Sequence, residues 1–248
     1  MNSPTQQGSR ALFDQATEDI AASLFKAYPQ YTYAQVLSAV KAAVLSQSYL
    51  RSEVVLNNSN NTFQFPILTN ENNNVGTGAR PTEFRLNLQD VFYVGGWMLY
   101  TSKVATLTST NMLLDTFPNV NTYTACATAG GAFPASSLYT LYNGKLTLTV
   151  NERTLITGYP TSNFLQVPQT QLTGVTGSAT VAAPISQFDG TALAFQEPNP
   201  VLIGSKKNRL NLVLPSNIAS AEAGLEETPV IGVLQMWGVL AQNITIVN

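Results

Sequence analysis

Apolar residues near the start of the chain recur with the spacing of an α-helix. Residues four apart lie on one side of a helix, so their repetition predicts an amphipathic face. The members of this stripe are Leu12, Phe13, Ala16, Ile20 and Leu24. Pro29 ends the predicted helix, because its ring cannot be accommodated in a helix interior.

A second helix is predicted directly after this proline. Thr32 and Gln35 have the spacing of a capping box, in which each side chain satisfies a free backbone N–H of the first turn. A second apolar stripe follows at Val36, Leu37, Val40 and Val44. We therefore expect residues 9–50 to be helical and residues 1–50 to form a helical N-terminal arm.

From Ser52 onward the apolar period changes to two, which is the period of a half-buried β-strand. The alternating sets are Phe63, Phe65 and Ile67; Phe84, Leu86 and Leu88; Leu146, Leu148 and Val150; and Leu210, Leu212 and Leu214. Two continuous apolar runs, residues 91–100 and 230–241, predict central strands that are covered on both faces.

These patterns predict a mainly β protein. About eight strand candidates occur without helices between them, which argues against a parallel α/β fold. Long turn-rich segments rich in Asn, Gly and Pro separate them, and strands that cross between two sheets tolerate such connections. We expect a single eight-stranded antiparallel jelly-roll sandwich over residues 51–248.

Composition excludes several kinds of chemistry. Only 10% of the 248 residues are charged, and the net charge is −2. The chain has no His and one Cys, Cys126, which excludes His-dependent catalytic triads, His-ligated metals and an internal disulfide. The near-neutral charge argues against a non-specific nucleic-acid binder. We expect no catalytic residues, no metal site and no cofactor.

The first residues and the apolar runs bear on localisation. The N-terminus lacks the basic and apolar regions of a signal peptide. Residues 91–100 and 230–241 are shorter than the ~20 residues of a membrane helix. We therefore expect a soluble protein that is made in a cytoplasm without an export signal.

Paired carboxylates are the one catalytic device that this composition easily permits, since glycoside hydrolysis needs two of them. The candidates at strands or strand ends are Glu83, Asp90, Glu152, Asp189 and Glu197. No aromatic-rich sugar cleft accompanies them, so surface and turn carboxylates are the favoured interpretation.

Other motifs have ordinary explanations. Residues 70–74 are Asn-rich but lack the order of a calcium loop, and residues 76–78 lack the context of a nucleotide-binding loop. Asn143 and Gly144 predict a two-residue hairpin turn. Residues 206–209 form the one basic cluster, and we expect a charged turn rather than a phosphate site. Cys126 is expected to be a small packed residue.

The low charge of the strands favours an assembled protein over a monomer. Monomeric β-proteins place charges on edge strands to prevent pairing with neighbours. Amides and hydroxyls cost less to desolvate than ions, and they suit surfaces that end against other protein. The alternative is a soluble monomer with an exterior rich in Asn and Thr.

Four segments within the predicted sandwich are similar to a known family: residues 141–151, 164–168, 208–215 and 235–243. Together with the helical arm and the low charge, they resemble a jelly-roll coat protein of an icosahedral, tail-less bacteriophage or a similar non-enveloped virus. The resemblance implies a structural virion protein that self-assembles into a capsid shell through sandwich edges, loops and the arm. It also implies assembly in the host cytoplasm and contacts with other capsid subunits or vertex proteins.

One feature departs from many coat proteins, whose arms are rich in Lys and Arg. The first 40 residues contain only Arg10 and Lys26. We therefore expect no sequence-specific nucleic-acid binding and at most weak or indirect genome contact. Instead, the arm is expected to lie against the inner side of the sandwich or against a neighbouring subunit.

Two alternatives remain on the same fold. One is a carbohydrate-binding attachment or spike protein, which exposed aromatic residues on a loop face would favour. Trp97 and Trp237 are instead expected to be buried in central strands. The other alternative is a carboxylate-pair glycosidase.

Overall fold

The computed structural model of the chain describes residues 4–57, 59–67, 86–104, 114–117, 136–166, 199–218 and 230–246. Two helices come first, α1 (Pro4–Ala27) and α2 (Tyr33–Ala42). The strands of the described part are β1 (Val44–Leu56), β2 (Thr62–Pro66), β3 (Val91–Lys103), β4 (Lys145–Val150), β5 (Arg153–Pro160), β6 (Val201–Ile203), β7 (Asn208–Val213) and β8 (Val230–Gln242). Two short 3-10 helices, η2 (Ser136–Asn143) and η3 (Thr161–Phe164), flank the β4–β5 pair.

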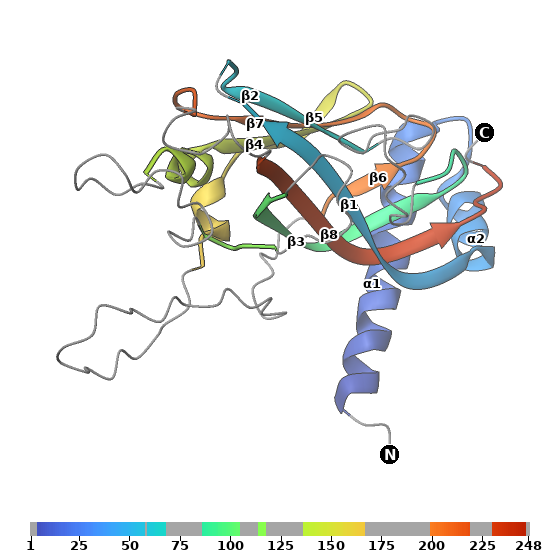
Figure 1. The fold of residues 1–248 in the computed structure, drawn as a ribbon. Helices are drawn as coiled ribbons and strands as arrows, with labels where there is room; N and C mark the ends of the chain where they lie inside the picture. The colour runs from blue at the N-terminus through green and yellow to red at the C-terminus, as the bar shows by residue number, and fades with distance from the viewer. Residues whose placement is uncertain are drawn as a thin grey trace, which may run out of the picture.

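These strands form two antiparallel sheets of four (Figure 1). The first sheet has the order β1-β8-β3-β6, and the second has the order β2-β7-β4-β5. Strand β1 pairs with β8, β2 with β7, β3 with β6 and β4 with β5. The mainly β prediction is confirmed, and the number of strands agrees with the number expected.

The alternating residues of the strands form a core between the two sheets. Phe63, Phe65, Leu146 and Leu210 are buried there, as the period-two pattern predicts. Trp97 of β3 joins this core and is fully buried. The predicted strands around residues 63–67, 146–150 and 210–214 are therefore confirmed.

The helices build a second core on the opposite face of the first sheet. Ile20, Leu24, Val36 and Val40 pack with buried sheet residues, which are Val91, Tyr93, Val201, Ile203, Val239 and Ala241. In Figure 1, α1 and α2 lie beside this sheet and away from the second one. Strands β3 and β8 are therefore apolar on both faces because each face has a core, and their prediction as central strands is confirmed.

The connection between the helices follows the predicted capping chemistry. Helix α1 ends at Ala27, before Pro29. The Gln35 backbone N–H donates to Thr32 Oγ1 at 3.4 Å, and the Thr32 N–H donates to Gln35 Oε1 at 2.9 Å. The capping box is confirmed, and it fixes the direction in which α2 leaves the turn.

The helical region is shorter than predicted. Helix α2 ends at Ala42, and residues 44–50 belong to β1, so the helical prediction for these residues is wrong. Their helical spacing is overridden because β1 pairs with β8 along its whole length. The boundary expected between residues 50 and 51 therefore falls inside a strand.

The strand predicted around residues 84–88 is also not observed in its described part. Leu86 is buried and Leu88 is exposed, but the segment forms a turn in which the Asp90 N–H donates to the Asn87 carbonyl at 3.0 Å. Phe84 lies outside the described residues.

Candidate assembly surfaces

The carboxylates considered for catalysis are not paired in the described part of the chain. Asp90 is buried, and its carboxylate accepts hydrogen bonds from the Asn87 backbone N–H (3.3 Å), Asn87 Nδ2 (2.9 Å) and the Asn243 N–H (3.2 Å). It therefore holds the turn before β3 against the end of β8. Glu152 lies exposed in a turn.

The remaining candidates of that kind, Glu83, Asp189 and Glu197, lie outside the described residues. So do residues 70–74, residues 76–78 and Cys126. Among the described residues, no group of three or more Asp, Glu, Cys or His side chains is placed to hold a metal ion.

The hairpin turn lies at a different place from the one predicted. Asn143 is the last residue of η2, and Gly144 precedes β4 rather than linking two strands. A Cβ at Gly144 would lie 2.8 Å from Leu214 Cδ2, so this glycine permits close packing. The two-residue turn joins β4 to β5 instead, where Asn151 (φ 50°) and Glu152 (φ 65°) both adopt left-handed conformations.

The basic cluster of residues 206–209 is a turn only in its first half: Lys206 and Lys207 precede β7, as predicted, whereas Asn208 and Arg209 belong to the strand. Lys206 Nζ lies 4.5 Å from the centroid of the Tyr28 ring, which is a cation–π contact. The Tyr28 hydroxyl also hydrogen-bonds with Ser205 Oγ. Asn208 is buried, and its Nδ2 donates to the Ile203 and Lys206 carbonyls. The turn is thereby attached to the end of α1.

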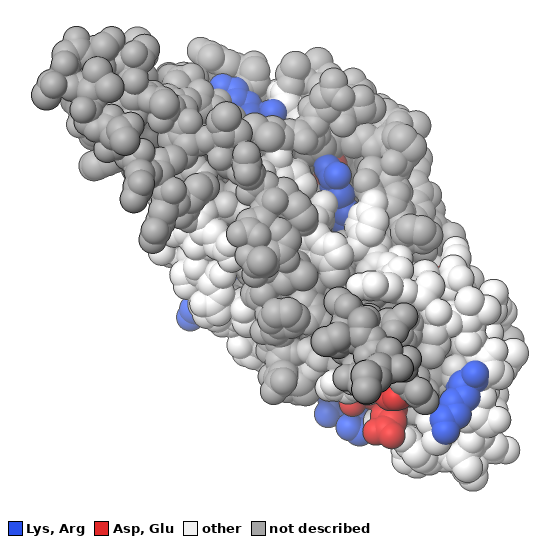
Figure 2. Space-filling model, turned by 90° about the horizontal axis from the view of Figure 1, so that it is seen from below, with Lys and Arg blue, Asp and Glu red and all other residues white. Residues whose placement is uncertain are grey.

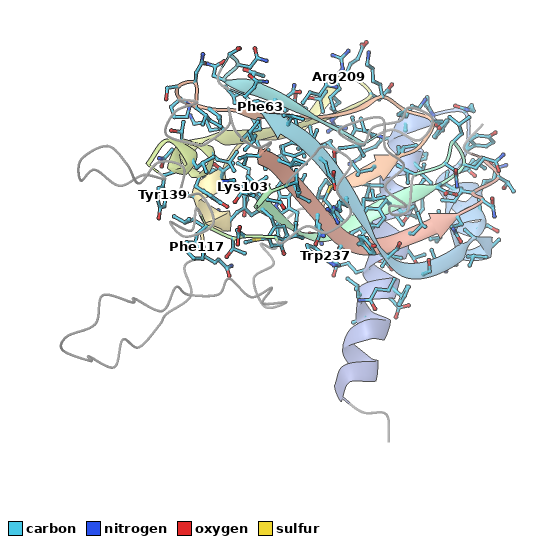
Figure 3. All side chains as sticks on the ribbon, viewed as in Figure 1. Phe63, Lys103, Phe117, Tyr139, Arg209 and Trp237 are labelled. Atoms are coloured by element: carbon cyan, nitrogen blue, oxygen red, sulfur yellow. The ribbon has the colours of Figure 1, made fainter. Side chains whose placement is uncertain are left out.

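The outer face of the β2-β7-β4-β5 sheet carries neutral polar side chains and two cations. Gln64, Asn211 and Thr147 form one row across three neighbouring strands. Lys145 and Arg209 lie in the rows on either side, and Figure 3 shows Arg209 on this outer side of the sandwich. The described residues of this face include no carboxylate. Hydroxyl and amide groups of this kind can be buried against protein at lower cost than ions.

The four edge strands differ in how open they are to pairing. Strand β6 has three residues, β2 has five and ends at Pro66, and β5 has an irregular register and Gly158 at φ 68°. Strand β1 instead pairs with β8 over 13 residues without a register shift. It carries an ion pair between Arg51 and Glu53 at 2.7 Å. Strand β1 is therefore the longest and most regular edge in the described structure.

Both tryptophans lie in central strands, as predicted, but only Trp97 is fully buried, so the prediction that Trp237 is buried is wrong. Trp97 packs against Tyr159 and Phe164, with ring centroids 5.2 and 6.0 Å apart. Trp237 lies on β8 and is half-buried against the core between the sheets. Because Trp97 is enclosed, its ring is not available to stack on a sugar.

Charged groups are sparse on the described surface. Among the described residues of the face in Figure 2, a few blue and red side chains lie among white, uncharged ones. In the described part of the chain, neither α1 nor α2 combines the length and hydrophobicity that crossing a membrane requires.

Comparisons with known proteins give no relative: no family model, no curated protein and no solved structure matches this chain.

Proposed function

We propose that this chain is a jelly-roll coat protein that self-associates into the icosahedral shell of a non-enveloped virus. The observation that carries this proposal is the nested pairing of the strands. Strand β1 pairs with β8, β2 with β7, β3 with β6 and β4 with β5. A jelly roll has this pairing because one long antiparallel hairpin of eight strands is wound into two sheets.

The division of the pairs between the sheets supports the same fold. The pairs β1–β8 and β3–β6 share one sheet, while β2–β7 and β4–β5 share the other. Winding a long hairpin around a sandwich places alternate pairs in opposite sheets, as here. Jelly rolls of this kind occur in viral capsids and in lectins, so the fold alone does not decide between them.

Surface chemistry favours the capsid over the lectin. The open face of the second sheet presents Gln64, Asn211 and Thr147 in one row, and β1 offers a long regular edge. Such surfaces suit contacts with further protein. A sugar-binding face would present accessible aromatic rings for stacking, whereas Trp97 is fully buried and the exposed rings of Phe25 and Tyr33 pack edge-to-face on each other.

The helical arm contributes through the part of α1 that leaves the sandwich. Ala16, Ile20 and Leu24 are buried on the chain's own sheet, so this half of α1 belongs to the subunit. Figure 1 shows α1 continuing beyond the sheets toward the N-terminus. We place the contact between neighbouring subunits on this projecting part, within residues 4–11.

The test is assembly of the purified full-length chain, followed by light scattering and negative-stain electron microscopy. We expect closed particles of uniform size at high protein concentration. A variant that lacks residues 2–10 should keep the far-ultraviolet circular dichroism of a folded β-protein and assemble poorly. The matched control is Lys41→Ala, which changes an exposed residue of α2 and should assemble normally.

Two outcomes would reject the proposal. A monomer at every protein concentration and salt concentration would exclude self-assembly. Specific binding to one sugar on a glycan array, without particles, would support the attachment-protein alternative instead.

A further inference from the structure

A cavity of about 340 Å³ lies where the end of α1 meets the β4–β5 turn and β6. Its polar lining includes Lys26 of α1, Asn151 and Arg153 of the β4–β5 hairpin, and Asn199 before β6. Apolar side chains, among them Leu155 and Val201, form the rest of the wall. A few polar groups converging on a partly apolar hollow of this size are typical of a small-molecule site.

The charge of the cavity is positive. Lys26 and Arg153 both line it, and neither forms an ion pair with a carboxylate of the described residues. The β6–β7 turn adjoins it, because the Asn151 N–H donates to the Lys207 carbonyl at 3.0 Å. That turn and the start of β7 add Lys206, Lys207 and Arg209 to the same end of the sandwich, where the β4–β5 turn contributes one carboxylate, Glu152. An anion is therefore favoured there by several positive charges at once.

The walls of the cavity are held in place by the fold. Asn151 and Glu152 form a tight turn with positive φ at both residues, an uncommon conformation for Glu. On the other wall, Tyr28 attaches the end of α1 to Ser205 and Lys206. Lys26 and Arg153 therefore project from fixed backbones, so binding requires little rearrangement of the chain.

We propose that this cavity binds the phosphate monoester group of a small organic molecule. A phosphate monoester carries a charge of about −1.5 to −2 at pH 7. This charge balances the two cations, Lys26 and Arg153, better than the single negative charge of a carboxylate would. The Arg153 guanidinium offers a planar fork for two phosphate oxygens, and Lys26 adds a point charge. Asn151 and Asn199 can donate further hydrogen bonds, while Leu155 and Val201 contact the apolar part of the molecule.

This site differs from the assembly surfaces, and it does not depend on the proposed shell. In this proposal the end of α1 covers the sheet and also forms one wall of the ligand site. Because one wall is the helix and the other is the sandwich, a bound ligand would hold the two together. We therefore expect the ligand to slow amide hydrogen exchange in residues 20–28.

The test uses calorimetric titration of the full chain with three probes: ribose 5-phosphate, inorganic phosphate and an oligothymidylate of eight nucleotides. We expect ribose 5-phosphate to bind at least tenfold more tightly than inorganic phosphate, because its sugar adds contacts with the polar and apolar lining of the cavity that inorganic phosphate cannot make. Lys26→Ala and Arg153→Ala should each weaken binding at least tenfold, and Arg153→Lys less. Lys41→Ala, which removes an exposed cation of α2, should leave binding unchanged.

Circular dichroism of each variant shows whether it is folded, and all of these side chains are exposed, so folding should be retained. Hydrogen exchange of α1 provides a second readout of the same site. The proposal is overturned if ribose 5-phosphate does not bind, or if Lys41→Ala weakens its binding as much as Arg153→Ala does. Tight binding of oligothymidylate without ribose 5-phosphate binding would also overturn it and would indicate a nucleic-acid surface.

Discussion

Gly238 of β8 lies directly against the backbone carbonyl of Tyr93 in β3, so closely that a Cβ at position 238 would overlap with that oxygen. The two central strands of the first sheet therefore approach each other without a side chain between them here. The irregularity of β3 between Val94 and Gly96 is next to this point. Gly238 therefore permits β8 to approach β3 closely at this irregularity.

We predict that Gly238→Ala lowers the free energy of unfolding by about 3 kcal/mol, because an added methyl group must displace backbone. Chemical denaturation followed by tryptophan fluorescence measures this loss. Gly95→Ala is the matched control, since a Cβ there would have its nearest neighbour at 3.5 Å, an ordinary contact. Equal stability of the two variants would contradict the close approach.

Docking of the arm on its own sheet is tested at two adjacent residues of α1. Leu24 is fully buried, whereas Phe25 is 42% exposed and contacts Tyr33 edge-to-face. Leu24→Ala should cost about 2–5 kcal/mol of unfolding free energy, and Phe25→Ala should cost about 1 kcal/mol. A negligible effect of Leu24→Ala in thermal denaturation would show that α1 is not held on the sheet in solution.

Removal of residues 1–43, which deletes both helices, tests the docking of the arm more severely than a single substitution does. Tyr93 and Val239 of the first sheet are buried beneath the helices. We expect the truncated chain to expose this apolar face and to precipitate or bind hydrophobic dyes. A soluble truncated chain with a cooperative thermal transition would be the contrary result.

The Asp90 carboxylate offers a test of how the ends of β3 and β8 are joined. Asp90→Ala removes the acceptor for three hydrogen bonds, including that from the Asn243 N–H, and should cost about 3 kcal/mol. Leu88→Ala, in the same turn but exposed, should change stability by less than about 0.5 kcal/mol. Denaturant titration of both variants provides the comparison. Equal midpoints would show that the carboxylate does not hold the turn.

The buried Tyr142 hydroxyl should make the stability of the folded chain sensitive to alkaline pH. Burial raises the pKa of the Tyr142 hydroxyl well above its ordinary value, and the charge of Asp115 raises it further. The unfolded chain loses this proton near pH 10 while the folded chain keeps it, so stability must fall as the pH rises above 10. The expected slope is about 1.4 kcal/mol per pH unit from this residue.

The measurement is the free energy of unfolding between pH 8 and pH 11 for the wild type and for Tyr142→Phe. The variant keeps the buried ring but cannot ionise, so its stability should fall less steeply over this interval. Parallel curves would show that Tyr142 ionises equally in both states.

Several elements follow from local patterns in the sequence. The Thr32–Gln35 capping box, the alternating core residues of β2, β4 and β7, and the two apolar central strands depend on short-range signals. Residues 44–50 do not, because their strand conformation depends on β8, which is distant in the chain. Strand β5 has irregular pairing and Gly158, while β6 is three residues long, so neither shows a usable period.

The candidate binding cavity is harder still to predict. Lys26 and Arg153 belong to segments far apart in the sequence, and neither lies in a recognisable motif. What places them together is the docking of α1 on the sheet, which itself depends on the complete pairing of the first sheet. In contrast, the charged turn before β7 is predictable, because Lys206 and Lys207 are consecutive in the sequence.

The pairing of β1 with β8 has a consequence for biosynthesis. Every residue of β1 is opposite a residue of β8, yet most of the sequence separates the two strands. During translation, β1 therefore remains without its partner strand until β8 has left the exit tunnel of the ribosome. Until then the helices preceding β1 have no finished sheet to cover. Although α1 and α2 are synthesised first, their docking on this sheet is therefore among the last steps of folding.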